Sequence, residues 1–465
     1  MQWAQLLSKK HFQETTDTPV IYENDYDTII CSTLFRRLQD KAQVFPLDDD
    51  DYVRTRLTHS LEVSAIGKRI GEYVFHQLKN REVDHWFEEH SEKEFSDVLL
   101  CAGLVHDIGN PPFGHFGEYA IREWFSNHLS QLSPGGTKVS DILTEWQLQD
   151  FYCFEGNAQS LRLLSKTPYL GRTNGFNLSY SVLGSIIKYP VSSAELKSRT
   201  SNRYKKIGYH YAERVLFEDI QSSMGLNGNR HPLSYLLEAA DDIAYRTSDL
   251  EDAMVKKVIS FHQIVGAFEQ NDILFDEQGV DQSQVEKHVH QLKTFYQQEL
   301  RRNGQKPELT AVQRWNRYLQ GIMVQDAGNA FMKHYDDIMD GRFHGDLFDH
   351  TVSGCIIQVI AQLSERLIYT SSIKTRPELF GRRVIDSLLT QFMPAAIVYD
   401  TGESATFIER RTIDTISEFY KSMYRSESLG KSEQEKLYLR ILMVTDYISG
   451  MTDNYAKKLY QELFV

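Results

Sequence analysis

Apolar residues recur along most of this chain at spacings of three and four positions, the period of amphipathic helices. Only 11 prolines interrupt the 465 residues. The pattern therefore predicts an all-α protein with a few minor β elements, one of them near residues 343–350. A chain of this length can bury a large core, either as one helical unit or as two subdomains.

The predicted helices are separated by loops rich in glycine, proline or charge. We expect Thr58 to cap a helix whose buried side carries Leu61, Ile66, Ile70, Val74 and Leu78. Residues 190–209 lack apolar periodicity and predict a basic loop. The other expected helices cover residues 29–40, an apolar stretch that ends at His106, and residues 155–164, 232–254, 309–339, 351–371, 381–391, 408–424 and 433–460.

Composition narrows the class of protein. Hydrophobic residues make up 41% and charged residues 25%, as in ordinary globular proteins. The net charge of −13 argues against indiscriminate nucleic-acid binding, which needs a basic surface. The four cysteines form no CxxC pair, so neither a disulfide framework nor a zinc knuckle is expected. With no signal-peptide pattern at the start and no apolar run of membrane-spanning length, we expect a cytoplasmic protein.

The densest group of chemically useful residues lies in residues 104–118, with the sequence LVHDIGNPPFGHFGE. An apolar run leads to the adjacent His106 and Asp107, and the glycine and prolines that follow end the helix. His115 and Glu118 come directly after this loop. A His-Asp pair at a helix end can also be purely structural, because histidine suits the helix C-terminus and aspartate caps turns.

Two distant segments offer matching metal ligands. His59 lies just inside a predicted helix, and Asp241 begins a polar stripe on one face of another, followed by Tyr245, Asp249 and Asp252. Such a stripe is commonly a solvated surface, but the alanines beside it predict close packing. Two histidines and two aspartates form a mixed nitrogen and oxygen site that suits Mn²⁺, Mg²⁺, Fe²⁺ or Zn²⁺. An ion with free coordination positions lowers the pKa of a bound water and polarises phosphorus.

Six segments together resemble the HD-domain phosphohydrolase superfamily, and within it the bacterial deoxyguanosine triphosphate triphosphohydrolases. They are RRLQDKAQVFPL (36–47), VRTRLTHS (53–60), HDIGNPPFGHFGE (106–118), FEGNAQ (154–159), EAADDIAY (238–245) and DYISGMTD (446–453). The resemblance implies an HD core with the metal site in residues 1–255. Residues 256–465 would then be a helical C-terminal region that completes the substrate pocket and forms oligomer contacts.

The resemblance also implies a reaction, the hydrolysis of dGTP to deoxyguanosine and tripolyphosphate, in which a metal-activated water attacks the α-phosphorus. Such an activity would control the dNTP pool. One divalent metal per subunit, Mn²⁺ or Mg²⁺ before Fe²⁺ or Zn²⁺, would be held by His59, His106, Asp107 and Asp241. The implied catalytic pair is His115 and Glu118. Imidazole titrates near neutral pH and can pass a proton to the departing 5′-oxygen, while the glutamate one helical turn away orients it.

The same resemblance implies contacts with each part of the substrate. A triphosphate carries about four negative charges and needs cationic partners beside the metal. The implied phosphate contacts are Arg56, Lys188 and Lys206, although Lys206 in a polar loop could equally be a solvated residue. The implied sugar contacts are Gln43, Tyr245 and Asp249, with Tyr245 occupying the space of a 2′-hydroxyl. Glu378 resembles the residue that reads guanine, and Asn110 is a further substrate-binding position.

The chain departs from the family pattern at residues 256–340 and 405–429. Relatives place an arginine from a neighbouring subunit near the base, and Arg410 or Arg411 could fill that role. We expect a homo-oligomer, by resemblance a hexamer, with a dNTP effector and single-stranded DNA as further candidate partners. Two alternatives stay open: a phosphohydrolase of broader nucleotide specificity, which could release single phosphates, and a non-catalytic nucleotide-binding or single-stranded nucleic-acid-binding protein.

Overall fold

The computed structural model describes residues 1–13, 21–48, 50–171, 175–198, 205–271, 275, 277–402 and 405–465. In these ranges the regular structure is helical, apart from a single β-bridge between Ala42 and Thr55. The predicted all-α fold is therefore confirmed. The β element expected near residues 343–350 is wrong, because side chains satisfy the backbone locally there: Asp346 accepts from Phe348 N–H at 2.8 Å and Asp349 from Asp346 N–H at 2.9 Å.

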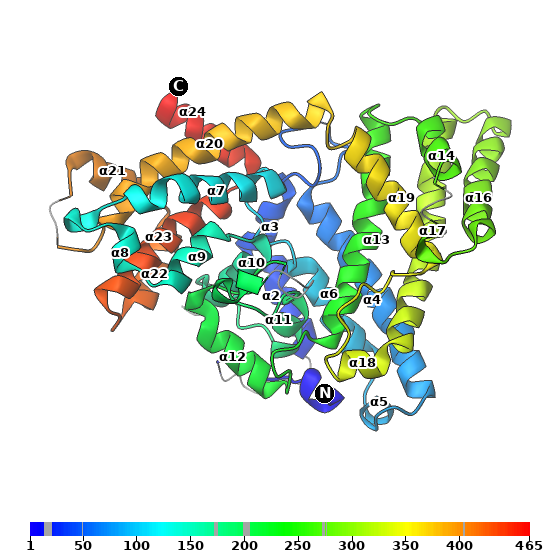
Figure 1. Ribbon diagram of the computed structural model, residues 1–465, viewed down its shortest axis with the longest axis horizontal. Helices are drawn as coiled ribbons and strands as arrows, with labels where there is room; N and C mark the ends of the chain where they lie inside the picture. The colour runs from blue at the N-terminus through cyan, green and yellow to red at the C-terminus, as the bar shows by residue number, and fades with distance from the viewer. Residues whose placement is uncertain are drawn as a thin grey trace.

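Three helices pack at the centre of the molecule, α4 (Arg56–Asn80), α6 (Glu92–Val105) and α13 (Pro232–Val255) (Figure 1). They approach closely because small residues line their contacts. A Cβ atom on Gly103 of α6 would lie 2.6 Å from Ser64 Cα of α4, so only glycine fits at this crossing. These three helices bring together the segments that carry His59, His106 and Asp241.

The N-terminus of α4 differs from the prediction. Thr55 rather than Thr58 is the cap: its hydroxyl accepts from Thr58 N–H, and the Thr58 hydroxyl accepts from Thr55 N–H at 3.1 Å. Leu61, expected in the core, is exposed, because the buried stripe starts at Val63 and continues through Ile66. His59 remains in the first turns of the helix, with its side chain buried.

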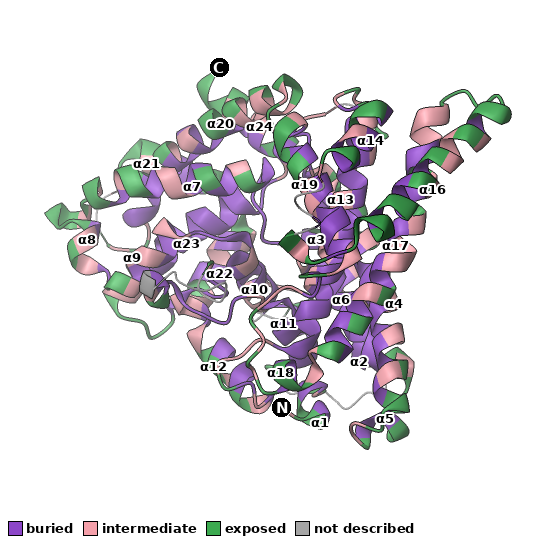
Figure 2. Cartoon of the chain, turned by 45° about the vertical axis from the view of Figure 1, so that its right-hand side comes forward, coloured by how far each residue is buried: buried purple, intermediate pink, exposed green. Residues whose placement is uncertain are grey.

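Two sets of helices flank this centre (Figure 1). On one side, α14 (Phe261–Glu269), α16 (Gln282–Arg301), α17 (Pro307–Lys333) and α19 (Val352–Leu367) extend the hydrophobic core around α13 and α4. On the other side, a second hydrophobic cluster joins α7 (Gly114–His128) and α9 (Glu145–Tyr152) to α20 (Ser372–Ile397), α22 (Glu418–Ser428), α23 (Glu433–Ser449) and α24 (Asp453–Phe464). Figure 2 shows the buried faces of α13 and α6 inside this assembly. The division at residue 255 stays a prediction.

Several expected helices have different limits. The helices expected at 29–40, 408–424 and 433–460 are each broken, since Ser32, Ser417 and Thr452 cap new helices with their hydroxyls. The helix expected at 381–391 is instead the longer α20, which contains Pro377 and Pro394 and is held by its buried second half. Residues 199–204 of the expected basic loop lie outside the described residues.

The remaining elements are short or peripheral. The α-helices are α1 (Trp3–Leu6), α2 (Ile21–Cys31), α3 (Thr33–Arg37), α5 (Trp86–Glu89), α8 (Val139–Ile142), α10 (Gly156–Lys166), α11 (Tyr180–Ile186), α12 (Arg214–Ser223), α18 (Tyr335–Met339) and α21 (Phe407–Thr415). The 3-10 helices are η1 (Leu38–Asp40), η2 (Leu129–Gln131), η3 (Pro134–Gly136), η4 (Ser193–Ser198) and η6 (Tyr211–Glu213).

Candidate active site

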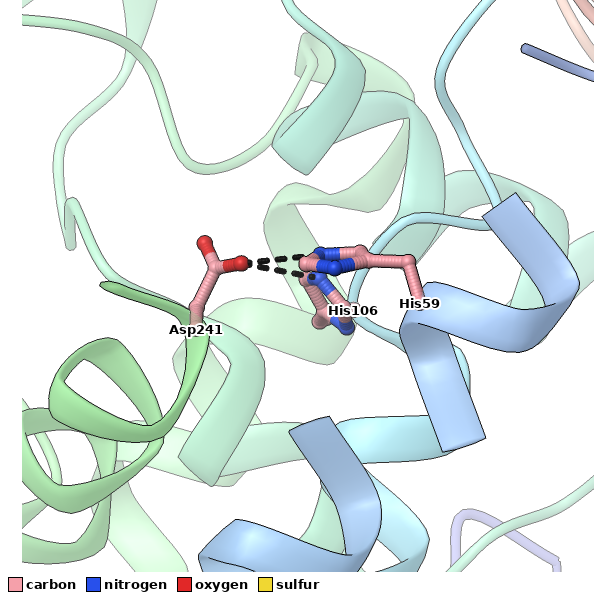
Figure 3. A group of neighbouring side chains, drawn as sticks. All are labelled: His59, His106 and Asp241. Atoms are coloured by element: carbon pink, nitrogen blue, oxygen red, sulfur yellow. Dashed lines mark hydrogen bonds and ion pairs between the residues drawn. The ribbon is translucent and has the colours of Figure 1, made fainter. Parts of the chain in front are cut away.

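Three of the four predicted metal ligands converge on one point. His59 of α4, His106 at the end of α6 and Asp241 of α13 each offer a ligand atom within 4.8 Å of the others. Figure 3 shows the Asp241 carboxylate facing both imidazoles. Its Oδ1 atom lies 3.0 Å from His59 Nε2 and 3.6 Å from His106 Nε2. Side chains from three distant segments thus form one compact group of nitrogen and oxygen donors.

The hydrogen bonding of His106 fits a metal ligand. Its Nδ1 lies 2.8 Å from Gly103 O, and a carbonyl can only accept, so Nδ1 carries the proton. Its Nε2 is buried without a hydrogen-bond partner and faces Asp241 and Asp107. A buried ring nitrogen without a hydrogen-bond partner is costly, whether or not it carries a proton, and a metal ion bound at Nε2 would remove this cost. The residues present therefore fit a divalent ion of the kind that imidazole and carboxylate bind together.

The fourth predicted ligand, Asp107, lies at the edge of this group. Its Oδ1 is 3.5 Å from His106 Nε2 and accepts from Asn110 Nδ2 at 2.5 Å, while its Oδ2 pairs with Arg56. Burial disfavours the charge of Asp107, but the Arg56 guanidinium and the two imidazoles of His106 and His59 together outweigh burial and lower the pKa of the carboxyl to about 2. The carboxylate is therefore held ionised between the metal group and two predicted substrate-binding residues.

The carboxylates also act on His106. Burial alone would lower its pKa, but the charges of Asp107 and Asp241 outweigh burial and raise the pKa of His106 to about 9. The same negative field would attract a divalent cation. Because a histidine binds metal through a neutral nitrogen, metal binding would displace the proton.

His115 and Glu118 lie on α7, one helical turn apart. His115 Nδ1 is 3.2 Å from Glu118 Oε2, and Gly156 N–H donates to Glu118 Oε1 at 2.8 Å. The histidine side chain is 70% exposed, whereas Glu118 is 2% exposed. Burial opposes the charge of Glu118, but His115, the charge of Lys206 and the Gly156 N–H together outweigh burial and lower the pKa of the carboxyl. An accessible imidazole is thus oriented by a buried, fixed carboxylate.

The turn that carries this chemistry is packed against α10. A Cβ atom on Gly109 would lie 2.2 Å from Gly156 O and from Ser160 N, so a side chain is excluded there. The Ser160 hydroxyl donates to His106 O at 3.0 Å and accepts from Gly109 N–H at 2.9 Å. Helix α10 therefore fixes the backbone on both sides of Asp107.

Lys206 has a partner that the sequence did not reveal. Its Nζ lies 2.8 Å from Oε1 of the buried Glu155, the residue that precedes α10. Burial, followed by the nearby charge of Glu118, raises the pKa of Glu155. Glu155 lies in the FEGNAQ segment, but nothing in that segment predicts its contact with Lys206. The predicted phosphate contact of Lys206 would require this ion pair to be shared or broken.

The other predicted phosphate lysine is also paired. Lys188 Nζ lies 2.7 Å from Glu238 Oε1, and Arg230 binds the second oxygen of the same carboxylate at 2.8 Å. Glu238 stands one helical turn before Asp241 on α13. Lys188 therefore contacts α13 one helical turn before Asp241, and it lines a pocket with Arg230.

The predicted sugar contacts meet around a residue that the sequence analysis missed. Tyr369 OH lies 2.6 Å from Tyr245 OH and donates to Asp249 Oδ2 at 2.8 Å. Burial raises the pKa of Asp249 to about 7, and its Oδ1 is buried without a hydrogen-bond partner. The side-chain carbonyl of Gln43 is likewise buried and unpartnered. Both oxygens therefore have hydrogen-bonding capacity that no protein group uses.

Glu378 is joined to this region by Lys374, which was also missed. Lys374 Nζ lies 2.6 Å from Glu378 Oε1, 3.4 Å from Val44 O and 5.5 Å from the centre of the Tyr369 ring. The candidate trans-acting arginines lie elsewhere, on α21, where Arg410 donates to Ala405 O at 2.7 Å and Arg411 is exposed.

Two further residues support the loop before α7. Lys41 is buried and donates to Asn110 O at 2.5 Å and to Ser449 O at 2.8 Å. Asp453 accepts from Phe113 N–H at 2.9 Å, where Phe113 has a left-handed backbone, and from Ala42 N–H at 3.2 Å. Both residues lie in segments that carry the family resemblance, but only the fold shows that they meet.

The chain is similar to known proteins over nearly its whole length. The family model for the HD domain matches residues 56–153. A deoxyguanosinetriphosphate triphosphohydrolase-like protein of Listeria monocytogenes is 42% identical over 100% of this chain and 99% of its own length. A protein with the same description from Synechocystis is 32% identical over 100% and 99%. A deoxyguanosinetriphosphate triphosphohydrolase of Yersinia enterocolitica is 30% identical over 95% and 93%. Within the described residues, no helix is both long and apolar enough to cross a membrane.

Proposed function

Because this chain belongs to the family of deoxyguanosinetriphosphate triphosphohydrolase-like HD-domain proteins, we propose that it hydrolyses dGTP to deoxyguanosine and tripolyphosphate. In this reaction a water attacks the α-phosphorus, the bond from phosphorus to the 5′-oxygen breaks, and that oxygen takes up a proton. The family relationship supports an HD phosphohydrolase related to dGTPases. The choice of dGTP and of this bond is the proposal.

The convergence of His59, His106 and Asp241 is the observation that carries the proposal. These three residues, with Asp107, would hold one divalent cation, Mn²⁺ or Mg²⁺ before Fe²⁺ or Zn²⁺. Such a cation supplies Lewis-acid chemistry: it polarises a phosphate and lowers the pKa of water. Arg56, which pairs with Asp107, would contact a phosphate beside the cation.

His115 is proposed to transfer the proton to the departing oxygen. Its exposure leaves the imidazole accessible to a substrate, and Glu118 fixes the ring through Nδ1, which leaves Nε2 free to act. Glu118 itself is held by Gly156 N–H. This arrangement is typical of a histidine that serves as a general acid or base.

The substrate would extend from the metal group along α13. Asn110, Lys188 and Lys206 would contact the phosphates. To do so, Lys188 and Lys206 would share or break their ion pairs with Glu238 and Glu155. Gln43 and Asp249, whose unpartnered oxygens are buried, would bind the 3′-hydroxyl, and Tyr245 would exclude a 2′-hydroxyl. Glu378 would accept from the guanine base.

The proposal is tested by supplying the purified protein with Mn²⁺ or Mg²⁺ and each dNTP, separately and in pairs, and identifying the products. We expect deoxyguanosine and intact tripolyphosphate from dGTP. In Asp241→Asn the affinity for Mn²⁺ should fall by about 10- to 100-fold or more, and activity should be lost with it. Asp337→Asn, an exposed aspartate that pairs with Arg342, is the matched control and should change neither. Release of orthophosphate or pyrophosphate, or full Mn²⁺ binding by Asp241→Asn, would contradict the proposal.

Assembly and further partners belong to the same proposal. The proposal includes a cytoplasmic homo-oligomer, by family a hexamer. Arg410 or Arg411 would reach the base pocket of a neighbouring subunit, since α21 follows the end of α20 that lies far from Glu378 (Figure 1). Stimulation by a second dNTP would indicate an effector. Salt-dependent binding of an oligonucleotide would indicate the single-stranded DNA partner.

A further inference from the structure

Lys374 and Glu378 form an ion pair in the first two turns of α20, and helix stability does not explain it. A lysine near a helix N-terminus opposes the helix dipole, and the order lysine then glutamate at i and i+4 is the less favourable one. The pair is nevertheless well defined, with 2.6 Å between Nζ and Oε1 and side chains only 17% and 13% exposed. Because the two side chains are shielded from solvent although their order along the helix is unfavourable, we infer that the pair has a role outside the helix.

The pair faces the proposed nucleoside pocket. Lys374 Nζ lies 3.4 Å from the carbonyl of Val44, the residue after Gln43, and 5.5 Å from the ring centre of Tyr369. Tyr369 in turn contacts both Tyr245 and Asp249. A continuous series of contacts therefore runs from the sugar-binding residues to the Lys374–Glu378 pair.

We propose that Lys374 reads the base together with Glu378, and is a specificity-determining residue that selects a 6-oxopurine by donating to its O6 atom. This inference rests on the proposed function, because it assumes that a deoxynucleoside lies between Tyr245 and Glu378. An ammonium group only donates and a carboxylate only accepts. Side by side, they present one donor followed by two acceptor oxygens.

That order is complementary to guanine and to no other common base. Guanine offers the acceptor O6, then the donors N1–H and N2–H. Adenine offers the donor N6–H beside the acceptor N1, so that a donor would face the ammonium and an acceptor would face the carboxylate. Cytosine has the same mismatch. Thymine matches at O4 and N3–H, but its O2 would face the carboxylate. Rejection through opposed donors or opposed acceptors is an effective source of specificity.

The test is Lys374→Met, which removes the donor and keeps the length of the side chain. The ratio kcat/KM is measured for dGTP and dITP, which have O6, and for dATP and 2-aminopurine deoxyriboside triphosphate, which lack it. We expect a fall of about 10- to 100-fold for the first two substrates, the effect of losing one charged hydrogen bond, and less than about 3-fold for the last two. Lys431→Met is the matched control, because Lys431 forms an i, i+4 pair with Glu435 in the same order at another helix, and it should alter no ratio.

A binding measurement that needs no hydrolysis separates this inference from the proposed function. The metal-free protein is titrated with fluorescent 2-aminopurine deoxyriboside, with deoxyguanosine as competitor, and Lys374→Met should remove the advantage of deoxyguanosine. An equal loss for all four triphosphates, or a wild-type protein that does not discriminate among them, would overturn the role of Lys374. If the wild type binds deoxyguanosine through Lys374 but hydrolyses no dNTP, the proposed function fails and the base-reading role stands.

Discussion

At the scale of single residues, two histidines of the described chain each form an ion pair with the glutamate three positions later, in different surroundings. His115 and Glu118 lie 3.2 Å apart, and His85 and Glu88 lie 2.8 Å apart. Both histidines are exposed, at 70% and 72%. Only Glu118 is buried and held by a backbone N–H. A fixed carboxylate can orient an imidazole toward a substrate, whereas an exposed glutamate rotates with its partner.

We therefore expect His115→Ala to lower turnover of dGTP by about 10²- to 10⁴-fold, the usual contribution of general acid–base catalysis. His85→Ala should leave turnover unchanged. Manganese binding, measured by electron paramagnetic resonance, should stay normal in both variants, because His115 is outside the group of metal-binding donors. Near-normal turnover of His115→Ala with Mn²⁺ bound would rule out the proton-transfer role.

At the scale of helices, periodicity predicts α4, α6 and α13 because each has a long buried stripe. Their convergence at His59, His106 and Asp241 could be inferred only from the family resemblance. The breaks at Ser32, Ser417 and Thr452 could not be predicted, because a hydroxyl cap competes locally with a continued helix and packing decides between them. Tyr369 was missed because it reaches Tyr245 across 124 residues of sequence, through the fold alone.

Helix α13 begins with a buried histidine whose protonation state matters for stability. His231 Nδ1 accepts from Leu233 N–H at 3.1 Å, and its Nε2 lies 2.9 Å from Leu6 O. The imidazole must therefore be neutral, with its proton on Nε2. Burial lowers the pKa of His231 to about 4. Since α13 also carries Asp241, this cap supports the element that completes the metal group.

The sign of the pH dependence follows from this lowered pKa. Below pH 6.5 the unfolded chain binds a proton at His231 that the folded protein takes up only near pH 4, so the stabilisation is present above pH 6.5 and lost as the pH falls toward 4. Between pH 7 and pH 5 we expect a loss of about 2 kcal/mol from this group. His231→Asn keeps a capping side chain without a titrating group, and urea unfolding should show a correspondingly smaller loss. His85→Asn, at an exposed position, should unfold with the same pH dependence as the wild type, and an equal dependence for His231→Asn would contradict the prediction.

At the scale of the whole molecule, one buried arginine joins segments that are far apart in the sequence. Arg162 of α10 is 1% exposed and binds Asp446 of α23, Glu213 of η6 and Glu427 of α22 at 2.8–2.9 Å. Because α10 also supports the backbone of His106 and Gly109 through Ser160, these ion pairs link the second hydrophobic cluster to the candidate active site.

Replacing Arg162 tests whether this link holds the two parts of the molecule together. Arg162→Met would leave the buried carboxylates of Glu213 and Asp446 without this cation, while Glu427 keeps Lys166 at 3.5 Å. Breaking a buried pair from one side typically costs about 3–5 kcal/mol. The midpoint of urea unfolding should therefore shift to a much lower concentration. Mn²⁺ binding should be lost before global unfolding, because α10 would no longer hold the turn around Asp107. Arg342→Met removes an arginine that also binds two aspartates but is 61% exposed, and should cost less than about 1 kcal/mol. Similar losses for the two variants would show that burial does not strengthen the Arg162 network, and that packing alone fixes α10 against the candidate site.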